Sequence, residues 1–374
     1  MFDRRLLENF DWIFLLLVLA LNTLGIVNLY SASLGAETGG TPVYLKQFFW
    51  MLGGLLIMTI IIFFDYHFLK KFVAYFLYGF GIFLLILVLF IGRKTAGAQR
   101  WIDLGIMAFQ PSEITKVLVM IALAKYFSDR EFTTTLGMKQ LLGPALILGI
   151  PFLLIMKQPD LGTALHLSFS GLSLILFLGV RTYVLVGSVI AGGVAFPFGW
   201  HILKDYQKKR ILTFLDPEGD PLGAGYHIIQ SKIAVGSGQF WGKGFLKGTQ
   251  SQLRFLPEQH TDFAFSVFSE EWGFFGSLVL LTLFFLFIFT GLMIVRRCQD
   301  RFGAFLALGL ISLLFWQILI NVSMVTGLMP VVGIPLPFIS YGGTSLLTTF
   351  ICVGLLLNIS MRRFIFQDSA GVKL

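Results

Sequence analysis

The chain has 374 residues, of which 56% are hydrophobic and 13% are charged, and it contains 41 phenylalanines. No soluble domain of this size needs so much apolar surface, so the composition excludes an ordinary soluble protein and indicates a membrane protein. The formal net charge is +8, but the basic residues are scattered over loops without forming a basic arm. A nucleic-acid partner is therefore not predicted.

Ten apolar segments predict membrane-spanning helices, because a spanning helix needs about 20 mostly apolar residues. They are 12–31, 45–63, 72–91, 112–127, 139–156, 160–178, 182–202, 265–295, 303–327 and 341–359. The fourth is the least typical, since it contains Glu113, Lys116 and Lys125, and the eighth is overlong and contains Glu270 and Glu271. We expect an all-α polytopic membrane protein whose residues 1–374 form a single transmembrane domain.

The basic residues predict how these spans are oriented, because cytoplasmic loops are enriched in Lys and Arg. One set of connections holds Arg4, Arg5, Lys70, Lys71, Arg130, Lys139, Arg181, Arg296, Arg297, Arg301, Arg362 and Arg363. The short connections opposite hold only Lys46, Arg93, Lys94, Arg100 and Lys157. The first set is therefore expected in the cytoplasm, together with both termini and a loose tail at 367–374.

Charged residues in and near the early spans are the first candidates for a site. Arg100 has a planar guanidinium that suits phosphate, but it could equally anchor the chain at the membrane interface beside Trp101. Glu113 and Lys116 lie on one helix face because they are three residues apart. Two alternatives stay open for them: a structural ion pair, or a cavity in which Lys116 faces Asp262. Asp160 opens the sixth span, where helix capping is favoured over a direct substrate role.

Residues 204–264 form the most polar part of the chain, with eight Lys/Arg and six Asp/Glu, and we expect a large extracytoplasmic loop here between spans seven and eight. Its amphipathic stretch 226–234 could lie on the membrane surface. The glycine-rich stretch 235–244 could cradle phosphate, but close backbone packing is the favoured interpretation. Asp262 ends the loop at the border of an apolar run, where a carboxylate is costly unless it has a partner or a function.

The last outer connection, 330–343, is rich in proline and glycine and is too irregular to face lipid, so it is expected to line a cavity. A zinc site is not predicted, because the histidines lack the spacing of a ligand set. These observations alone indicate a polytopic membrane protein with an outward-facing charged cavity. They leave an enzyme and a transporter comparably favoured.

The ordered motifs together resemble the SEDS family (shape, elongation, division and sporulation) over nearly the whole chain. The motifs are Gln-Arg-Trp-Ile at 99–102, Gln-Pro-Ser-Glu-Ile-Thr-Lys at 110–116, Gln-Pro-Asp-Leu-Gly-Thr-Ala at 158–164, Asp-Pro-Leu-Gly-Ala-Gly-Tyr-His at 220–227, Phe-Leu-Pro-Glu-Gln-His-Thr-Asp-Phe at 255–263 and Pro-Leu-Pro-Phe-Ile-Ser-Tyr-Gly-Gly at 335–343. One departure is Gln-Phe-Trp at 239–241, where relatives more often have Gly-Leu-Phe.

The resemblance implies a peptidoglycan glycosyltransferase of the bacterial cytoplasmic (inner) membrane. Such enzymes polymerise lipid II, a disaccharide-pentapeptide on undecaprenyl pyrophosphate, into β-1,4-linked glycan strands during cell elongation. They usually act with a class B penicillin-binding protein and other elongation-complex proteins. In the family, the aspartate that matches Asp262 is the residue most tied to activity.

The chemistry needs one base for the acceptor hydroxyl and positive charge for the departing pyrophosphate. Asp262 is expected to be the base in a single inverting displacement, and a divalent cation (Mg²⁺ or Mn²⁺) could share the stabilisation of the leaving group. The expected substrate-binding residues are Lys116, Glu113, Arg100, Arg210, Asp160 and His260. Two alternatives remain: a lipid II flippase, which needs access from both leaflets, and a non-catalytic scaffold of the elongation machinery.

Overall fold

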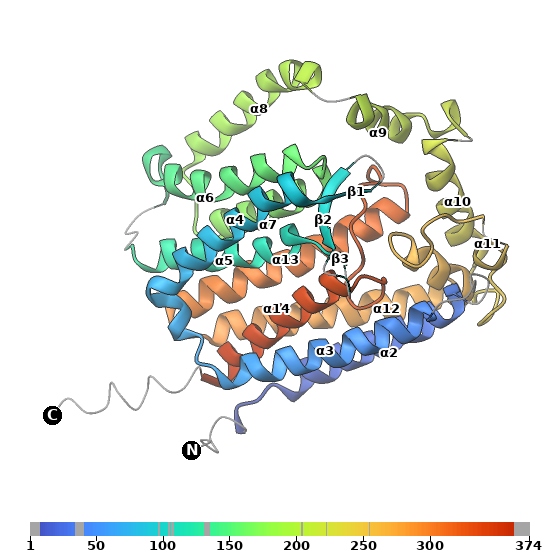
Figure 1. The fold of residues 1–374 in the computed structure, drawn as a ribbon, viewed down its shortest axis with the longest axis horizontal. Coiled ribbons are helices and arrows are strands. Elements are labelled where there is room, and N and C mark those ends of the chain that lie inside the picture. Colours follow the sequence, from blue (N-terminus) through green and yellow to red (C-terminus); the bar gives the residue numbers. More distant parts are fainter. Residues whose placement is uncertain are drawn as a thin grey trace.

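The structure, a computed structural model, describes residues 8–33, 41–95, 98–103, 105, 108–130, 135–202, 205–221, 223–253 and 255–362. The expected tail at 367–374 lies outside the described residues. Long helices run side by side along the length of the molecule (Figure 1). Their apolar composition and length explain this arrangement, because in lipid a backbone satisfies its own hydrogen bonds most readily as a helix.

Each of the ten predicted spans coincides with a helix. The helices are α2 (Trp12–Ser33), α3 (Val43–Phe63), α4 (Ala74–Ile91), α5 (Pro111–Ser128), α6 (Met138–Lys157), α7 (Leu161–Phe177), α8 (Thr182–Ile202), α12 (Ala264–Arg297), α13 (Arg301–Val325) and α14 (Gly343–Arg362). A π-helical turn, η1 (Leu69–Val73), leads into α4. Within the described residues, seven helices are long and apolar enough to cross a membrane, namely α2, α3, α4, α6, α12, α13 and α14. The expected all-α polytopic fold is confirmed.

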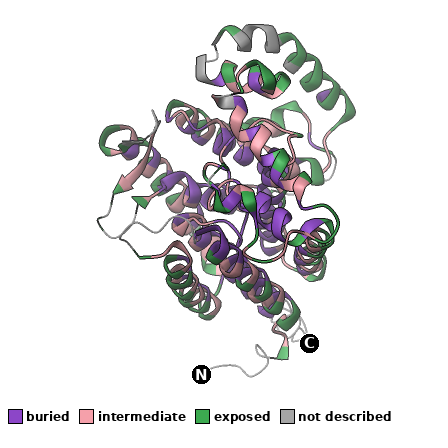
Figure 2. Cartoon of the chain, turned by 90° about the vertical axis from the view of Figure 1, so that its right-hand side faces the viewer, coloured by how far each residue is buried: buried purple, intermediate pink, exposed green. Residues whose placement is uncertain are grey.

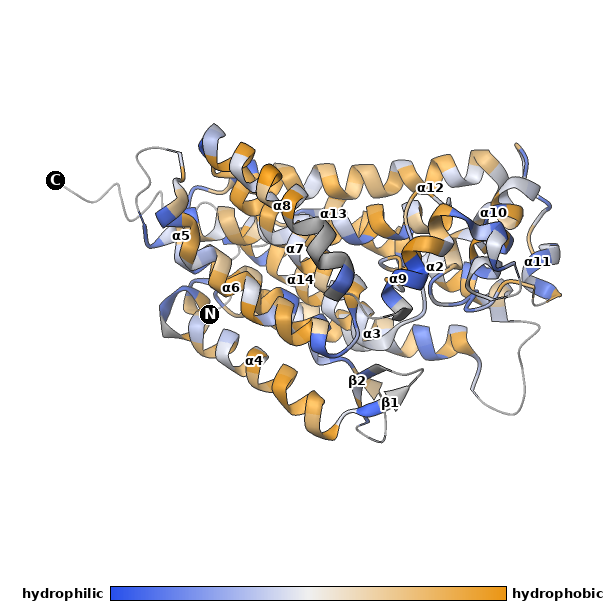
Figure 3. Ribbon diagram, turned by 90° about the horizontal axis from the view of Figure 1, so that it is seen from above, coloured by the Kyte–Doolittle hydropathy of each residue, from blue (hydrophilic) through white to orange (hydrophobic). Residues whose placement is uncertain are grey.

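The core lies where α13 and α14 meet α5, α7, α3 and α12. Buried residues gather in the middle of the cross-section, and exposed residues lie around its rim (Figure 2). The helices α4, α6 and α12, on the outside of the bundle, consist largely of hydrophobic residues (Figure 3). Side chains such as Phe76, Phe90 and Leu153 are exposed there, as expected for helices that face lipid rather than water.

The polar segment between α8 and α12 contains four short helical elements: α9 (Asp205–Leu215), η2 (Pro217–Gly219), α10 (Ala224–Ser237) and α11 (Thr249–Gln252). The predicted amphipathic stretch 226–234 lies within α10, which packs against α12. Ile228 and Ala234 are buried there, and Ser231 Oγ lies 2.9 Å from Ser266 Oγ of α12. The segment therefore folds onto the bundle at one of its ends.

A small antiparallel sheet follows α4, in the order β1 (Arg93–Thr95), β2 (Ala98–Asp103) and β3 (Ala108–Phe109). Arg93 is paired with Trp101, and Ile102 with Phe109. From the sequence no strand is predicted here, and Arg93, Lys94 and Arg100 are placed only in a short connection. The sheet places Arg100 beside the first turn of α5, which begins at Pro111.

The overlong eighth span has a structural cause, a kink at Gly273, whose φ is 66°. Glu270 and Glu271 precede the kink and are buried in protein. A Cβ atom on Gly238 or Gly242 would lie 2.1 Å from a backbone carbonyl oxygen of this part of α12. The glycine-rich stretch is thus required for close packing.

The two ends of the bundle are formed by different elements. At one end α2 begins and α14 ends (Figure 1), and Arg362 of α14 donates hydrogen bonds to the carbonyl oxygens of Ile62 and Phe63 at the end of α3. The sheet, α9, α10 and the start of α12 lie toward the opposite end (Figure 1).

Candidate functional site

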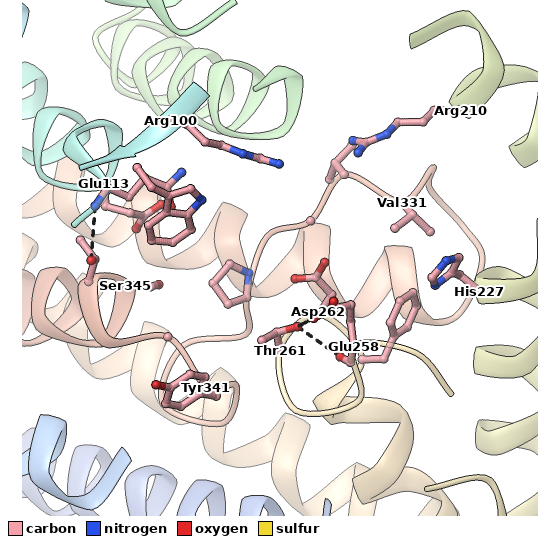
Figure 4. Close-up of a pocket in the computed structure, with 18 of the residues that line it drawn as sticks. Arg100, Glu113, Arg210, His227, Glu258, Thr261, Asp262, Val331, Tyr341 and Ser345 are labelled. Atoms are coloured by element: carbon pink, nitrogen blue, oxygen red, sulfur yellow. Dashed lines mark hydrogen bonds between the residues drawn. The ribbon is translucent and has the colours of Figure 1, made fainter. Parts of the chain in front are cut away.

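A cavity of about 610 Å³ opens among these elements at the second end of the bundle. Its wall combines β2, the start of α5, α9, α10, the segment before α12, the proline-rich loop and the start of α14 (Figure 4). The charged side chains that line it are Arg100, Glu113, Arg210, Glu258 and Asp262. The loop 330–343 contributes Val331, Val332, Gly333, Pro335, Tyr341 and Gly342, as expected for an irregular segment that lines a cavity.

Asp262 lies two residues before α12 begins, on a non-helical segment. Burial and, after it, the negative charge of Glu258 raise the pKa of the Asp262 carboxyl to about 6, while Arg100 and Arg210 act in the opposite direction. A carboxylate with such a pKa is a stronger base than an ordinary aspartate and is still ionised at neutral pH. These are the properties that a general base needs.

Arg100 extends into the cavity from β2. It forms an ion pair with Asp160, whose Oδ1 lies 3.5 Å from the Arg100 Nη1 atom. Asp160 itself is buried and caps α7, accepting a hydrogen bond from Thr163 N at 3.2 Å. Gln110 Nε2 also donates to Asp160 at 3.0 Å. The predicted capping role of Asp160 is confirmed, and its side chain orients Arg100 instead of lining the cavity.

Arg210 approaches the same space from α9, and in the view of Figure 4 its guanidinium and that of Arg100 extend toward one another above Asp262. It forms no ion pair within the part of the chain that the structure describes. The structure therefore brings together four of the predicted site residues, Arg100, Glu113, Arg210 and Asp262.

Lys116 does not share this cavity. Its Nζ atom lies 2.8 Å from Glu113 Oε1 and 3.1 Å from His166 Nδ1, and all three side chains are buried. Glu113 lines the cavity wall and Lys116 lies behind it. Of the two alternatives, the structure shows the ion pair and not a contact between Lys116 and Asp262.

His260 also lies outside the lining of the cavity. Its carbonyl oxygen accepts a hydrogen bond from Tyr341 N at 2.8 Å, and the two rings lie 6.3 Å apart. Burial lowers the pKa of the His260 imidazole, with Glu258 acting in the opposite direction. This contact joins the segment of His260 to the proline-rich loop, and the direct role of His260 toward substrate stays a prediction.

Sequence reasoning missed Glu258 and His227 as cavity residues. Glu258 has a φ of 48°, a backbone conformation that is uncommon outside glycine, and its Oε2 accepts a hydrogen bond from Thr261 Oγ1 at 3.0 Å. His227 lies on α10 with its ring 6.2 Å from that of Phe263. The available signal for Glu258 was its place four residues before Asp262 in the same motif.

The glycine-rich stretch is fixed around a buried carboxylate. Glu270 Oε1 lies 2.6 Å from Lys243 Nζ and accepts hydrogen bonds from Thr249 Oγ1 at 3.1 Å and Gln250 N at 3.0 Å. Lys243 Nζ is therefore already engaged by protein, and the backbone N–H groups of Lys243 and Gly244 donate to the carbonyl oxygens of Glu270 and Glu271. This supports the packing interpretation of residues 235–244. Among the described residues no group of three or more His, Cys, Asp or Glu side chains could hold a metal ion.

The comparisons with known proteins agree with the motifs. Residues 11–364 match the FtsW/RodA/SpoVE family of cell cycle proteins. The chain belongs to this family. It is 43% identical to the peptidoglycan glycosyltransferase MrdB of Escherichia coli K12, over 96% of each chain. It is 34% identical to the peptidoglycan glycosyltransferase RodA of Treponema pallidum, over 96% of this chain and 99% of the relative.

Solved structures show the same fold. A peptidoglycan synthase complex, described in terms of coordinated polymerisation and crosslinking, contains a chain that is 32% identical and matches with a TM-score of 0.81, over 95% of this chain and 98% of that one. The rod shape determining protein RodA of Thermus thermophilus is 29% identical and matches with a TM-score of 0.71 over the same shares. The expected membership of the SEDS family is confirmed, as is a multi-pass bacterial membrane protein.

Proposed function

We propose that the cavity around Asp262 is the active site at which this chain polymerises lipid II into β-1,4-linked glycan strands. The chain is a peptidoglycan glycosyltransferase, as its relatives are by name. The observation that carries the proposal is the meeting of one carboxylate of raised pKa with two guanidinium groups in a single cavity. That combination offers a base for a hydroxyl beside cations for a pyrophosphate.

The proposed step is a single displacement with inversion. The 4-hydroxyl of the acceptor sugar attacks the anomeric carbon of the donor, its proton passes to the Asp262 carboxylate, and the bond to pyrophosphate breaks with its electron pair on the leaving oxygen. Arg100 and Arg210 stabilise that developing charge, since a guanidinium suits phosphate oxygens. Pyrophosphate leaves without a strong general acid, so a second carboxylic acid is not required.

A divalent cation stays a prediction. Mg²⁺ or Mn²⁺ prefers oxygen ligands, and besides the proposed base the cavity offers the carboxylate of Glu258. The pyrophosphate of the substrate would have to supply most of the ligands. In this role the ion would neutralise charge on the leaving group.

We further propose that the cavity faces the extracytoplasmic side, with the basic end of the bundle in the cytoplasm. Lys70, Arg181 and Arg362 lie at the end opposite the cavity, at the boundaries of spanning helices. This distribution supports the orientation because Lys and Arg concentrate in cytoplasmic loops. ATP is absent outside, and lipid II fits because it already carries its leaving group.

The expected partner is a class B penicillin-binding protein, with other proteins of the elongation complex. The match to a chain in a peptidoglycan synthase complex, whose description couples polymerisation to crosslinking, supports this part of the proposal. A protein that only makes strands needs another to crosslink them.

The test is polymerisation of fluorescently labelled lipid II by purified protein in detergent, read as glycan strands on a gel. We expect polymer from the wild type and a rate lower by about 10²–10⁴ for Asp262→Asn, the usual range for loss of acid–base help, with lipid II binding retained. A flippase or a scaffold would make no polymer under these conditions. Normal polymerisation by folded Asp262→Asn would exclude the proposed mechanism.

A further inference from the structure

Buried amide side chains hold the non-helical segment that carries Asp262. Asn321 of α13 donates from Nδ2 to the carbonyl oxygen of Asp262 itself, at 3.0 Å. Asn28 of α2 donates to the carbonyl oxygen of Ala264, at 2.9 Å. Gln259 donates in the reverse direction, to the carbonyl oxygen of Ala32 at 2.8 Å. The segment is thus tied to two different helices.

The orientation of the Asn321 amide follows from its neighbours. Its Nδ2 atom also lies 2.7 Å from the carbonyl oxygen of Ile334. Both neighbours are acceptors, so the NH₂ group must face them, and each of its two hydrogens serves one carbonyl. Asn321 therefore sets the spacing between the backbone of Asp262 and the proline-rich loop, whose Gly333 faces the carboxylate.

The contacts with α2 are reciprocal. Asn28 and Ala32 are four residues apart and lie on one face of that helix, and each is bonded to the Asp262 segment, one as donor and one as acceptor. Ser31, between them, donates to Glu271 of α12. All of these side chains are buried, where an unpaired carbonyl or amide is costly. The bonds consequently fix where α12 starts relative to α2.

We propose that Asn321 and Asn28 are positioning residues for the reaction: their amide donors fix the backbone on both sides of Asp262 and thereby place its carboxylate against the acceptor hydroxyl. This inference rests on the proposed role of Asp262. Neither side chain lines the cavity, so neither contacts substrate. Their effect on rate is expected because a misplacement of about 1 Å can cost roughly 10² in rate.

Asn22 offers a matched control on the same helix. It is buried like Asn28, but its Nδ2 donates to the carbonyl oxygen of Val18, within α2, at 2.9 Å. Asn22→Leu, Asn28→Leu and Asn321→Leu each replace a buried amide by an apolar side chain of similar size. Only Asn28→Leu and Asn321→Leu remove a hydrogen bond to the segment of Asp262.

The experiment measures kcat, KM for lipid II and the pH–rate profile of Asn321→Leu, Asn28→Leu and Asn22→Leu, each normalised to folded protein by gel filtration and thermal unfolding. We expect kcat to fall at least about 10-fold for Asn321→Leu and about 3- to 10-fold for Asn28→Leu. Losses of this size are expected when a catalytic carboxylate is displaced by less than about 1 Å. KM should change little, because the cavity wall is intact. Asn22→Leu should stay within about 2-fold of wild type on the same reasoning.

The pH profile separates positioning from mere destabilisation. The charged groups that act on Asp262 are Glu258, Arg100, Arg210 and Asp160, and a displaced carboxylate meets a different balance of them and of water. Its apparent pKa should therefore move in Asn321→Leu. A variant that is only less stable would have a lower rate by the same factor at every pH, and the apparent pKa of its profile would not change. If Asn321→Leu does not fold, Asn321→Gln serves instead, since it keeps the amide and displaces it by one methylene.

Asp262→Asn is measured alongside, because it separates a failure of the proposed function from a failure of the positioning inference. If Asp262→Asn polymerises normally, the proposed function of the cavity fails. If Asp262→Asn is inactive but Asn321→Leu and Asn28→Leu (or Asn321→Gln) keep the kcat and pH profile of the Asn22→Leu control, the positioning inference alone is overturned.

Discussion

The carboxylate of Asp262 lies against Gly333, where a Cβ atom on residue 333 would come 3.4 Å from Oδ2. Gly333 has a φ of 74°, in the left-handed region that favours glycine. The proline-rich loop thus faces the proposed base with a residue that has no side chain, which leaves room beside the Asp262 carboxylate for a sugar hydroxyl. Arg100 and Arg210 extend into the same cavity (Figure 4).

Gly333→Ala is expected to slow polymerisation about 10-fold or more, because a methyl group and a strained backbone would shift the loop beside Asp262. Gly179→Ala is the control. Its φ is 83° and its Cβ would lie 3.4 Å from a Thr135 methyl, so the strain is similar, but it lies at the basic end. Initial rates at matched amounts of folded protein decide the prediction, and equal losses in the two variants would contradict it.

The rate should depend on pH through Asp262. The base is active when deprotonated and burial raises its pKa to about 6, so kcat/KM should rise with pH through about 6 and level off above it. Glu258→Gln removes a negative charge that raises this pKa, so the rising limb should move to lower pH.

A histidine could produce a similar limb, and His227 is the relevant control. Burial lowers the pKa of His227 and Glu258 raises it, so Glu258→Gln would shift it in the same direction. His227→Gln should leave the limb in place if Asp262 is responsible. A limb that disappears in folded, active His227→Gln would assign the titration to the histidine instead.

Sequence reasoning could predict the spans, because composition and length dictate helices in lipid, and it selected Asp262 because a carboxylate is costly at the border of a span. It could not predict the three-residue strand β1, whose pairing depends on β2. The left-handed backbone of Glu258 could not be predicted either, although its place in the motif of Asp262 was a signal for its role in the cavity. Arg210 lies 52 positions from Asp262, and only the packing of α9 against α10, and of α10 against α12, brings them together.

The orientation of the bundle can be tested by labelling. In a chain with Cys298→Ser and Cys352→Ser, Lys247→Cys should react with an impermeant thiol reagent in intact spheroplasts, and Arg181→Cys should react only after permeabilisation. Both positions are exposed, whereas Gly248 is buried and a side chain there would press on Ser251. The reverse pattern of labelling would place the cavity in the cytoplasm.

Lys116→Met is expected to destabilise the protein as well as slow it. Glu113 would keep a buried charge without its ammonium partner, and breaking a buried ion pair in this way costs about 3–5 kcal/mol. Thermal unfolding in detergent, beside polymerisation of lipid II, would show both losses.

The double variant Glu113→Gln with Lys116→Met decides whether the ammonium has a further role. It replaces the pair by two neutral side chains of similar size, so unfolding should return toward the wild-type temperature. Because Lys116 is enclosed by Glu113 and His166 at 2.8 Å and 3.1 Å and does not line the cavity, polymerisation should recover to within about 10-fold of wild type, a loss of about 1.4 kcal/mol in transition-state stabilisation. A double variant that folds normally yet makes no polymer would instead restore Lys116 as a direct contact of the substrate. Its ammonium would then have to leave Glu113 during the reaction.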